Sequence, residues 1–354
     1  SEDVSIEALL NNIDTSKTSI YFKSEFLSAS FIKNLNNYAL SNNAIFYINT
    51  DIIGNLAKTG NWYFNLQKDH KLIEEIVSNS SSLKSALSVD LSLYQNAGAN
   101  TIQQLAYTLA HANEYLNHFN EGIKTITLNV SIGTNYFFEI AKLRALRLLW
   151  ESLITEYNIS TNCHIVATPT KRNKTLYDYN TNMLRTTTEC MSAILGGANT
   201  VMNLPYDAIY HKDNEFGERI SRNQLLVLKH ESYFSKVNNP AEGSYYIENL
   251  TNQLAEKSLS LFKDIEKNGG FLKQLKEGTI QRKIKESATA EQAQFDNSEI
   301  VLLGTNIHPN ENDKMKHELE LYPFVKTNTR KTLIEPIIER RLAEKIEQER
   351  LKTE

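Results

Sequence analysis

Polar side chains are expected to gather at the ends of the predicted strands, where they could bind a ligand. The candidates for such a pocket are Ser92, Tyr94, Gln95, Asn135, Thr168, Asn203 and Tyr206. Two acids in similar positions, Asp90 and Asp207, are the candidate general bases. Amides and hydroxyls orient a ligand well, but they are poor general acids or bases near neutral pH. The residue types therefore favour ligand binding over proton transfer.

The histidines and cysteines form no recognisable metal or disulfide pattern. The sequence has 8 histidines and 2 cysteines, and no pair of histidines has metal-site spacing with a supporting carboxylate and cysteine. We therefore predict no metal site. Cys163 and Cys190 are too few for a disulfide framework. We expect free, mostly buried thiols, as in a cytoplasmic protein.

Short β-branched and aromatic runs alternate with longer helical stretches along most of the chain. Strands are predicted at residues 18–22, 44–49, 87–92, 125–132, 164–168 and 200–204. Helices are predicted at residues 29–40, within 69–85, and at 100–119, 135–157, 179–195, 215–229 and 246–267. This alternation predicts an α/β fold with parallel strands joined by crossover helices. It fits either a doubly wound sheet or most of a (β/α)8 barrel. The sequence contains no G-x-G-x-x-G fingerprint, which argues against a dinucleotide-binding sheet.

The character of the chain changes after Gly278. The predicted elements are a charged helix at 280–291, a short apolar strand at 299–303, an exposed loop at 309–316 and a charged helix at 332–352. In the last helix, the apolar residues at four-residue spacing would share one face; they are Ile334, Ile338, Leu342 and Ile346. That face could pack on its own domain or dock on a partner chain. We predict a first domain at 1–278 and a C-terminal extension at 279–354.

Composition and charge exclude several classes of partner. The formal net charge is -4 and the hydrophobic fraction is 41%, so the chain can bury a sizeable core and is not disordered. No basic stripe indicates nucleic-acid binding. No apolar run reaches the roughly 18 residues of a membrane span, and residues 1–12 lack the pattern of a signal peptide.

Several runs of the chain, taken in order and spacing, resemble the substrate barrel of methylmalonyl-CoA mutases. They are Tyr136–Arg144, Gly196–Asn199, Asn203–Asp207, Phe216–Asn223 and Asn239–Glu248. The resemblance covers roughly residues 86–306 well and 18–85 weakly. It implies a (β/α)8 TIM-barrel-type domain that is N-terminally incomplete, with about six βα units visible. The six strands would be the third to eighth of the barrel, and we expect the N-terminal arm and the first two strands to be missing from this sequence.

Positions that carry the chemistry in active members of that family are replaced here. Where such members have a Tyr-His pair before a Gln-Glu-Ala-Gly-Ala run, this sequence has Ser92-Leu93. In the strand that reads Arg-Thr-His-Ser-Gln-Thr in active members, His164, Val166 and Thr168 occupy the arginine, histidine and glutamine positions. In the next strand, where active members have the sequence His-Thr-Asn, this chain has Met202-Asn203-Leu204. Leucine cannot donate a hydrogen bond to a thioester carbonyl, so the resemblance implies an inactive barrel.

The resemblance further implies the small subunit of a heterodimeric mutase, with adenosylcobalamin held by the large partner subunit. No catalytic residue and no cofactor-binding residue is expected in this chain. His308, in Ile307-His308-Pro309-Asn310-Glu311, does not match the Asp-x-His-x-x-Gly motif of cobalamin domains. The alternative is a stand-alone enzyme or binding protein for a different small molecule. It would use Tyr94, Gln95, Asn135 and Asn203, with Asp90 or Asp207 as the base.

Overall fold

Six parallel strands follow one another in chain order. The computed structural model describes residues 5–119, 122–326 and 329–354. Its strands are β1 (Ser19–Phe22), β2 (Ile45–Ile48), β3 (Leu87–Asp90), β4 (Thr125–Ile132), β5 (Asn162–Pro169) and β6 (Thr200–Val201). Strands β1 and β2 form one sheet, and β3 to β6 form a second with sequential neighbours. A single parallel bridge between Tyr47 and Ser85 links the two sheets.

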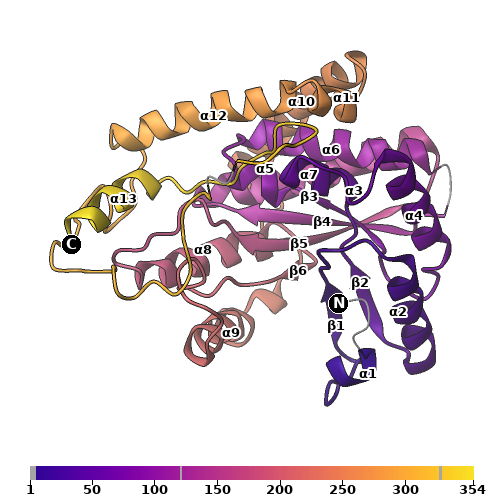
Figure 1. The fold of residues 1–354 in the computed structure, drawn as a ribbon, viewed down its shortest axis with the longest axis horizontal. Helices are drawn as coiled ribbons and strands as arrows, with labels where there is room; N and C mark the ends of the chain where they lie inside the picture. Colours follow the sequence, from indigo (N-terminus) through magenta and orange to yellow (C-terminus); the bar gives the residue numbers. More distant parts are fainter. Residues whose placement is uncertain (1–4, 120–121, 327–328) are drawn as a thin grey trace.

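Helices follow the strands and cover them (Figure 1). They are α1 (Ile6–Leu9), α2 (Ala29–Asn42), α3 (Ile52–Thr59), α4 (Leu66–Ser78), α5 (Ser92–Asn96), α6 (Thr101–His118), α7 (Tyr136–Tyr157), α8 (Thr181–Leu195), α9 (Glu215–His230), α10 (Tyr245–Lys267), α11 (Phe271–Lys276), α12 (Thr279–Asp296) and α13 (Glu344–Thr353). Polar N-caps start several of them. Asn100 and Gln103, for example, form a capping box at the start of α6.

The strand series curves back on itself. The hydroxyl of Tyr21 on β1 lies 2.6 Å from Thr200 Oγ1 on β6. In a flat sheet of six strands these two strands would be about 24 Å apart, because neighbouring strands are about 4.8 Å apart. The contact therefore requires strong curvature, as in a barrel. No backbone pairing joins β1 to β6 within the described residues, so closure of a complete (β/α)8 barrel stays a prediction.

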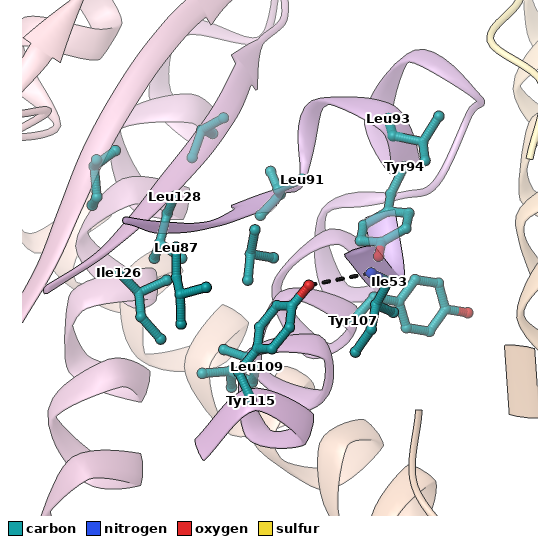
Figure 2. Close-up of a cluster of buried hydrophobic side chains, with 14 of the residues drawn as sticks. Ile53, Leu87, Leu91, Leu93, Tyr94, Tyr107, Leu109, Tyr115, Ile126 and Leu128 are labelled. Carbon is teal, nitrogen blue, oxygen red and sulfur yellow. Dashed lines mark hydrogen bonds between the residues drawn. The ribbon is translucent and has the colours of Figure 1, made fainter. Parts of the chain in front are cut away.

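The main hydrophobic core lies between the strands and the helices that cover them. Alternate strand residues such as Leu87, Ile126 and Leu128 are buried, and Figure 2 shows them on neighbouring strands beside Leu109 and Tyr115 of α6. Burying each aliphatic side chain stabilises the fold by roughly 1.5–3 kcal/mol. This packing holds the carboxyl ends of the strands in fixed relative positions.

The α/β fold with parallel strands and helices between them is confirmed, although β3 ends at Asp90 and β6 covers only Thr200–Val201. The prediction for residues 332–352 is wrong over its first half. Helix α13 begins at Glu344. Residues 332–343 form an extended strap whose backbone amides bond to other parts of the chain: Leu333 and Ile334 to Gly60, Ile337 to Ala57, Arg340 to Asn96, and Leu342 to Arg172. The strap runs across the molecule from α3 toward α13 (Figure 1).

The four apolar residues at 334–346 therefore do not share one helical face. Ile334 packs in the main core, whereas Leu342 belongs to a separate cluster with Phe295 and Leu302. Ile338 is 52% exposed. Pro336 helps to explain why this segment is extended and not helical, because a helical conformation is disfavoured for the residue before a proline.

The predicted strand at 299–303 is also absent. One bridge, between Leu303 and Ile307, is all the β-pairing found in this part of the described chain. Gly304 turns the chain with a positive φ of 78°, and the Asn306 side chain bonds to backbone groups of Phe295, Ile300 and Leu302. These local contacts replace a strand partner.

Residues on both sides of the predicted boundary at 278 contribute to the main core. Phe271 lies before the boundary, whereas Ile280, Ile284, Ile334 and Ile337 lie after it. The division into 1–278 and 279–354 stays a prediction. Among the described residues, none of the helices combines the length and the apolar character that crossing a bilayer demands.

Candidate functional site

The carboxyl ends of β1 and β3 carry an ion pair. Lys23 Nζ, just after β1, lies 3.5 Å from Asp90 Oδ2 at the end of β3. Asp90 also accepts hydrogen bonds from the backbone amide of Ser92, at 3.1 Å, and from the Ser92 hydroxyl. The candidate base Asp90 and the candidate pocket residue Ser92 are therefore bonded to each other. A role of Asp90 as a base stays a prediction.

Tyr94 lies in the core and not at the strand ends, because α5 turns its side chain under the helices. Figure 2 shows Tyr94 beside Tyr107 and Ile53. Its hydroxyl is 2.8 Å from His111 Nδ1, and the other ring nitrogen of His111 is 3.0 Å from Asp51 Oδ1. The Tyr115 hydroxyl donates to the same Asp51 oxygen at 2.7 Å. Tyr94 thus belongs to a buried polar network.

Gln95 and Asn135 are the two candidate residues that border a common cavity. This cavity, the α12 pocket, has a volume of about 590 Å³ and lies between the loops after β3, β4 and β5 on one side and α12 on the other. Asn135 is exposed and caps α7 by accepting from the Phe138 amide. Gln95 is buried and bonds to a lysine beneath the pocket floor.

That lysine, Lys142, is a buried cation with four polar partners. Its Nζ donates to Gln95 Oε1 at 2.9 Å, Gln104 Oε1 at 3.2 Å and the Ser131 carbonyl at 2.7 Å. It also forms an ion pair with Glu139 Oε2. Burial lowers the pKa of Lys142, and the neighbouring Glu139 carboxylate partly offsets that effect. The pair fixes the floor of the α12 pocket.

The candidates near β5 and β6 make mostly structural contacts. The Asn203 amide donates to the Ser221 carbonyl at 3.0 Å and to Gln224 Oε1 at 2.8 Å, which ties β6 to α9. Asp207 is buried and accepts from His211 and Asn214. Tyr206 packs against other aromatic rings. Thr168 is half-buried near the end of β5. Ligand binding by these residues stays a prediction.

Half-buried aromatic side chains connect the first strands to the last ones. Tyr21 Oη is 2.8 Å from His164 Nε2, and the Tyr47 ring stacks on His164 with centroids 4.3 Å apart. Burial lowers the pKa of His164, and the positive charge of Arg147 adds to this. A mostly neutral His164 is therefore part of an interior cluster made by four strands: β1, β2, β5 and β6.

Of three apolar residues at positions where the resemblance expects polar ones, two are buried and one is exposed. Leu93 is 3% exposed and lies in the main core. Val166 is also buried, whereas Met202 is exposed. Neither a buried leucine nor a buried valine can donate a hydrogen bond to a carbonyl oxygen. The arrangement therefore provides no polar anchor at these places.

That this chain binds no cobalamin stays a prediction. His308 is exposed and lies in a loop with a positive φ of 53°. No group of three or more His, Cys, Asp or Glu side chains that could hold a metal occurs among the described residues. No chemical step is therefore assigned to a cofactor on this chain.

Sequence reasoning missed several of the residues that organise this region. Asp51 caps α3, and an N-cap signal before an apolar run could have identified it. The inward direction of Tyr21 and Tyr47 could have been inferred from strand alternation. The Glu139–Lys142 pair was not missed, because two such residues three apart on a predicted helix indicate an internal ion pair. No local signal connects Lys142 to Gln95.

Comparison with known proteins identifies one family. The family model described as methylmalonyl-CoA mutase matches residues 3–352. The methylmalonyl-CoA mutase small subunit of Porphyromonas gingivalis is 39% identical over 236 residues, which cover 63% of this chain and 38% of that protein. The methylmalonyl-CoA mutase of Rhizobium meliloti is 33% identical, with 75% of this chain and 40% of that protein covered. The methylmalonyl-CoA mutase large subunit of Propionibacterium freudenreichii subsp. shermanii is 30% identical, with 77% and 38% covered. The chain thus spans about two fifths of the length of these relatives.

Proposed function

The chain belongs to the methylmalonyl-CoA mutase family, and on that premise we propose that it is the small, non-catalytic subunit of a heterodimeric mutase. The larger subunit binds adenosylcobalamin and interconverts methylmalonyl-CoA and succinyl-CoA. This chain is its structural partner. The names of the relatives, one a small subunit and another a large subunit, support an assembly of two unlike chains.

The replacement of the thioester anchor by Leu93 is the observation that carries the proposal. Leu93 is buried in the main core, so it neither reaches a substrate nor donates a hydrogen bond. A thioester carbonyl that lost its water shell there would stay unpaired, which costs about 1–3 kcal/mol. The interior cluster of Tyr21, Tyr47 and His164 supports the same conclusion, because it fills space between the strands.

Co-expression with a related large subunit tests the proposal. We expect a one-to-one complex in native mass spectrometry, with methylmalonyl-CoA turnover that depends on adenosylcobalamin. The purified chain alone should form no succinyl-CoA when the cofactor is added. Cobalamin-dependent turnover by the pure chain would contradict the proposal, as would a stable monomer that does not bind the large subunit.

A further inference from the structure

The α12 pocket has the size and construction of a ligand site. Its volume is about 590 Å³, which falls within the roughly 300–1,000 Å³ typical of small-molecule pockets and far exceeds the space of a single water. Its lining includes polar residues, such as Gln95 and Glu139, and apolar ones, such as Ile300, Leu302 and Leu342. A ligand with a polar head and an apolar body matches this lining.

Two polar atoms meet beside Gly133. A Cβ atom placed on Gly133 would lie 3.2 Å from Gln95 Nε2 and 3.2 Å from Glu139 Oε1. Gly133 has no positive φ, so the backbone conformation does not demand glycine. The missing side chain instead leaves space in front of the two polar atoms.

Both atoms are available to a ligand. Lys142 contacts the other polar atom of each side chain: it donates a hydrogen bond to Gln95 Oε1 and forms an ion pair with Glu139 Oε2. Because an ammonium group only donates, this contact settles which end of the Gln95 amide is oxygen. Among the hydrogen bonds and ion pairs of the described residues, those of Gln95 and Glu139 with Lys142 use Gln95 Oε1 and Glu139 Oε2, and none uses Gln95 Nε2 or Glu139 Oε1. The pocket therefore presents one donor and one acceptor side by side.

The charges around the pocket are balanced. Lys142 pairs with Glu139, and Arg172 Nε lies 2.6 Å from Glu291 Oε2. A carboxylate ligand would be repelled by Glu139, and a cation would find no unpaired acid. The balance favours a neutral ligand.

We propose that the α12 pocket binds a small neutral molecule through a cis-amide edge, such as a primary carboxamide, a urea or a lactam. Its N–H donates to Glu139 Oε1 and its carbonyl accepts from Gln95 Nε2. The apolar body of the ligand packs against Leu302 and Leu342. A secondary trans-amide does not fit, because its N–H and carbonyl point in opposite directions.

Titration of the chain with benzamide, followed by calorimetry and ligand-observed NMR, tests this site. We expect saturable binding at one site, with benzoate and N,N-dimethylbenzamide at least tenfold weaker. Binding should change little with salt, since no net charge is neutralised. Absence of saturable benzamide binding, or equal binding of benzoate, would overturn the proposal.

Variants separate the pocket from other surfaces. Gly133→Ala places a methyl group between the two polar atoms and should weaken benzamide binding at least tenfold, whereas Thr134→Ala, at the exposed rim, should not. Gln95→Glu keeps an oxygen for Lys142 but replaces the donor, and it should cause a similar loss if Gly133→Ala does not fold. Unchanged binding in a folded Gly133→Ala or Gln95→Glu variant would refute the site. The readout needs no turnover and no partner, so this result is independent of the proposed function.

Discussion

The Tyr21 hydroxyl lies 2.8 Å from His164 Nε2, although 143 positions separate the two residues in the chain. The same hydroxyl is 2.6 Å from Thr200 Oγ1, and Tyr47 stacks on both rings of the pair. These contacts connect the first two strands to the last two through the space that the strands enclose. They help to hold the curvature of the strand series where no backbone pairing between β1 and β6 is described.

The hydroxyl of Tyr21 should contribute measurably to stability. We expect Tyr21→Phe to lower the free energy of unfolding by about 0.5–1.5 kcal/mol, because the hydrogen bonds are lost while the ring stack with Tyr47 is kept. The matched control is Tyr38→Phe, whose ring stacks on Phe46. Urea denaturation of the three proteins measures the difference. Equal midpoints for Tyr21→Phe and wild type would show that the contact is energetically neutral.

His164 should make the fold less stable at mildly acidic pH. Burial lowers its folded-state pKa below the ordinary value of 6.5. As pH falls through 6.5 toward the folded-state pKa, the unfolded chain takes up the proton first, and stability decreases. Above 6.5 both states are neutral and the effect vanishes. We expect His164→Gln to lose less stability than wild type between about pH 7 and 5, measured by urea denaturation at each pH. The same pH dependence of the unfolding free energy in both proteins would contradict this prediction.

The sequence pattern predicted most strands because the alternation of apolar residues is visible within a few neighbouring positions. Strand β4 was predicted at 125–132 and spans Thr125–Ile132, since alternate apolar side chains pack on the helices. The strap at 332–343 could not be predicted in this way. Its four-residue apolar spacing is that of a helix, but its amides bond to carbonyls such as those of Gly60 and Asn96, which lie far away in the sequence.

The candidate site was predicted less well for a related reason. Tyr94 follows β3 closely, and Gln95 is its neighbour, yet α5 directs Tyr94 toward His111 and Gln95 toward Lys142. Sequence position identified the loop but not the direction of each side chain. Asn135 lies between β4 and α7, caps α7 and borders the α12 pocket, while its role in binding stays a prediction.

Substitutions in the strap should affect stability differently at a buried and at an exposed apolar residue. Leu342 is 4% exposed and Ile338 is 52% exposed. We expect Leu342→Asp to destabilise the chain by several kcal/mol, because a carboxylate would be buried without a partner. Ile338→Asp should change stability by no more than about 0.5 kcal/mol. Thermal unfolding of both variants measures this, and similar melting temperatures would mean that the strap is detached in solution.

Asp51 should be essential to the buried network under α3. It accepts hydrogen bonds from the Gly54 amide, the Tyr115 hydroxyl and the Asp90 amide. Burial alone would raise its pKa, but the charge and hydrogen bond of His111 outweigh burial and hold the pKa below the usual range. Asp51→Ala is expected to cost about 1–3 kcal/mol, because the buried Tyr115 hydroxyl and the Gly54 and Asp90 amides lose their acceptor.

The stabilisation from Asp51 is present at neutral pH, where its carboxyl group is ionised in both the folded and the unfolded chain. It should be lost as pH falls below about 3.9, where the unfolded carboxyl takes up a proton first. The control is Asp14→Ala, since Asp14 lies in an exposed turn and bonds to Ser16 and Lys17. A cost for Asp51→Ala no larger than that for Asp14→Ala in denaturant titrations would refute the role of the network.

Restoring a histidine at position 93 should not create an active site. Leu93 is in the main core beside Tyr94 (Figure 2), so Leu93→His places a polar ring among apolar side chains and should lower stability by about 1–3 kcal/mol. We expect no cobalamin-dependent turnover of methylmalonyl-CoA by this variant alone. Leu93→Met, which keeps an apolar side chain of similar size, should cost less than about 1.5 kcal/mol. Turnover assays and thermal unfolding of both variants test this. Activity in Leu93→His alone would contradict the proposal that this chain holds no cofactor.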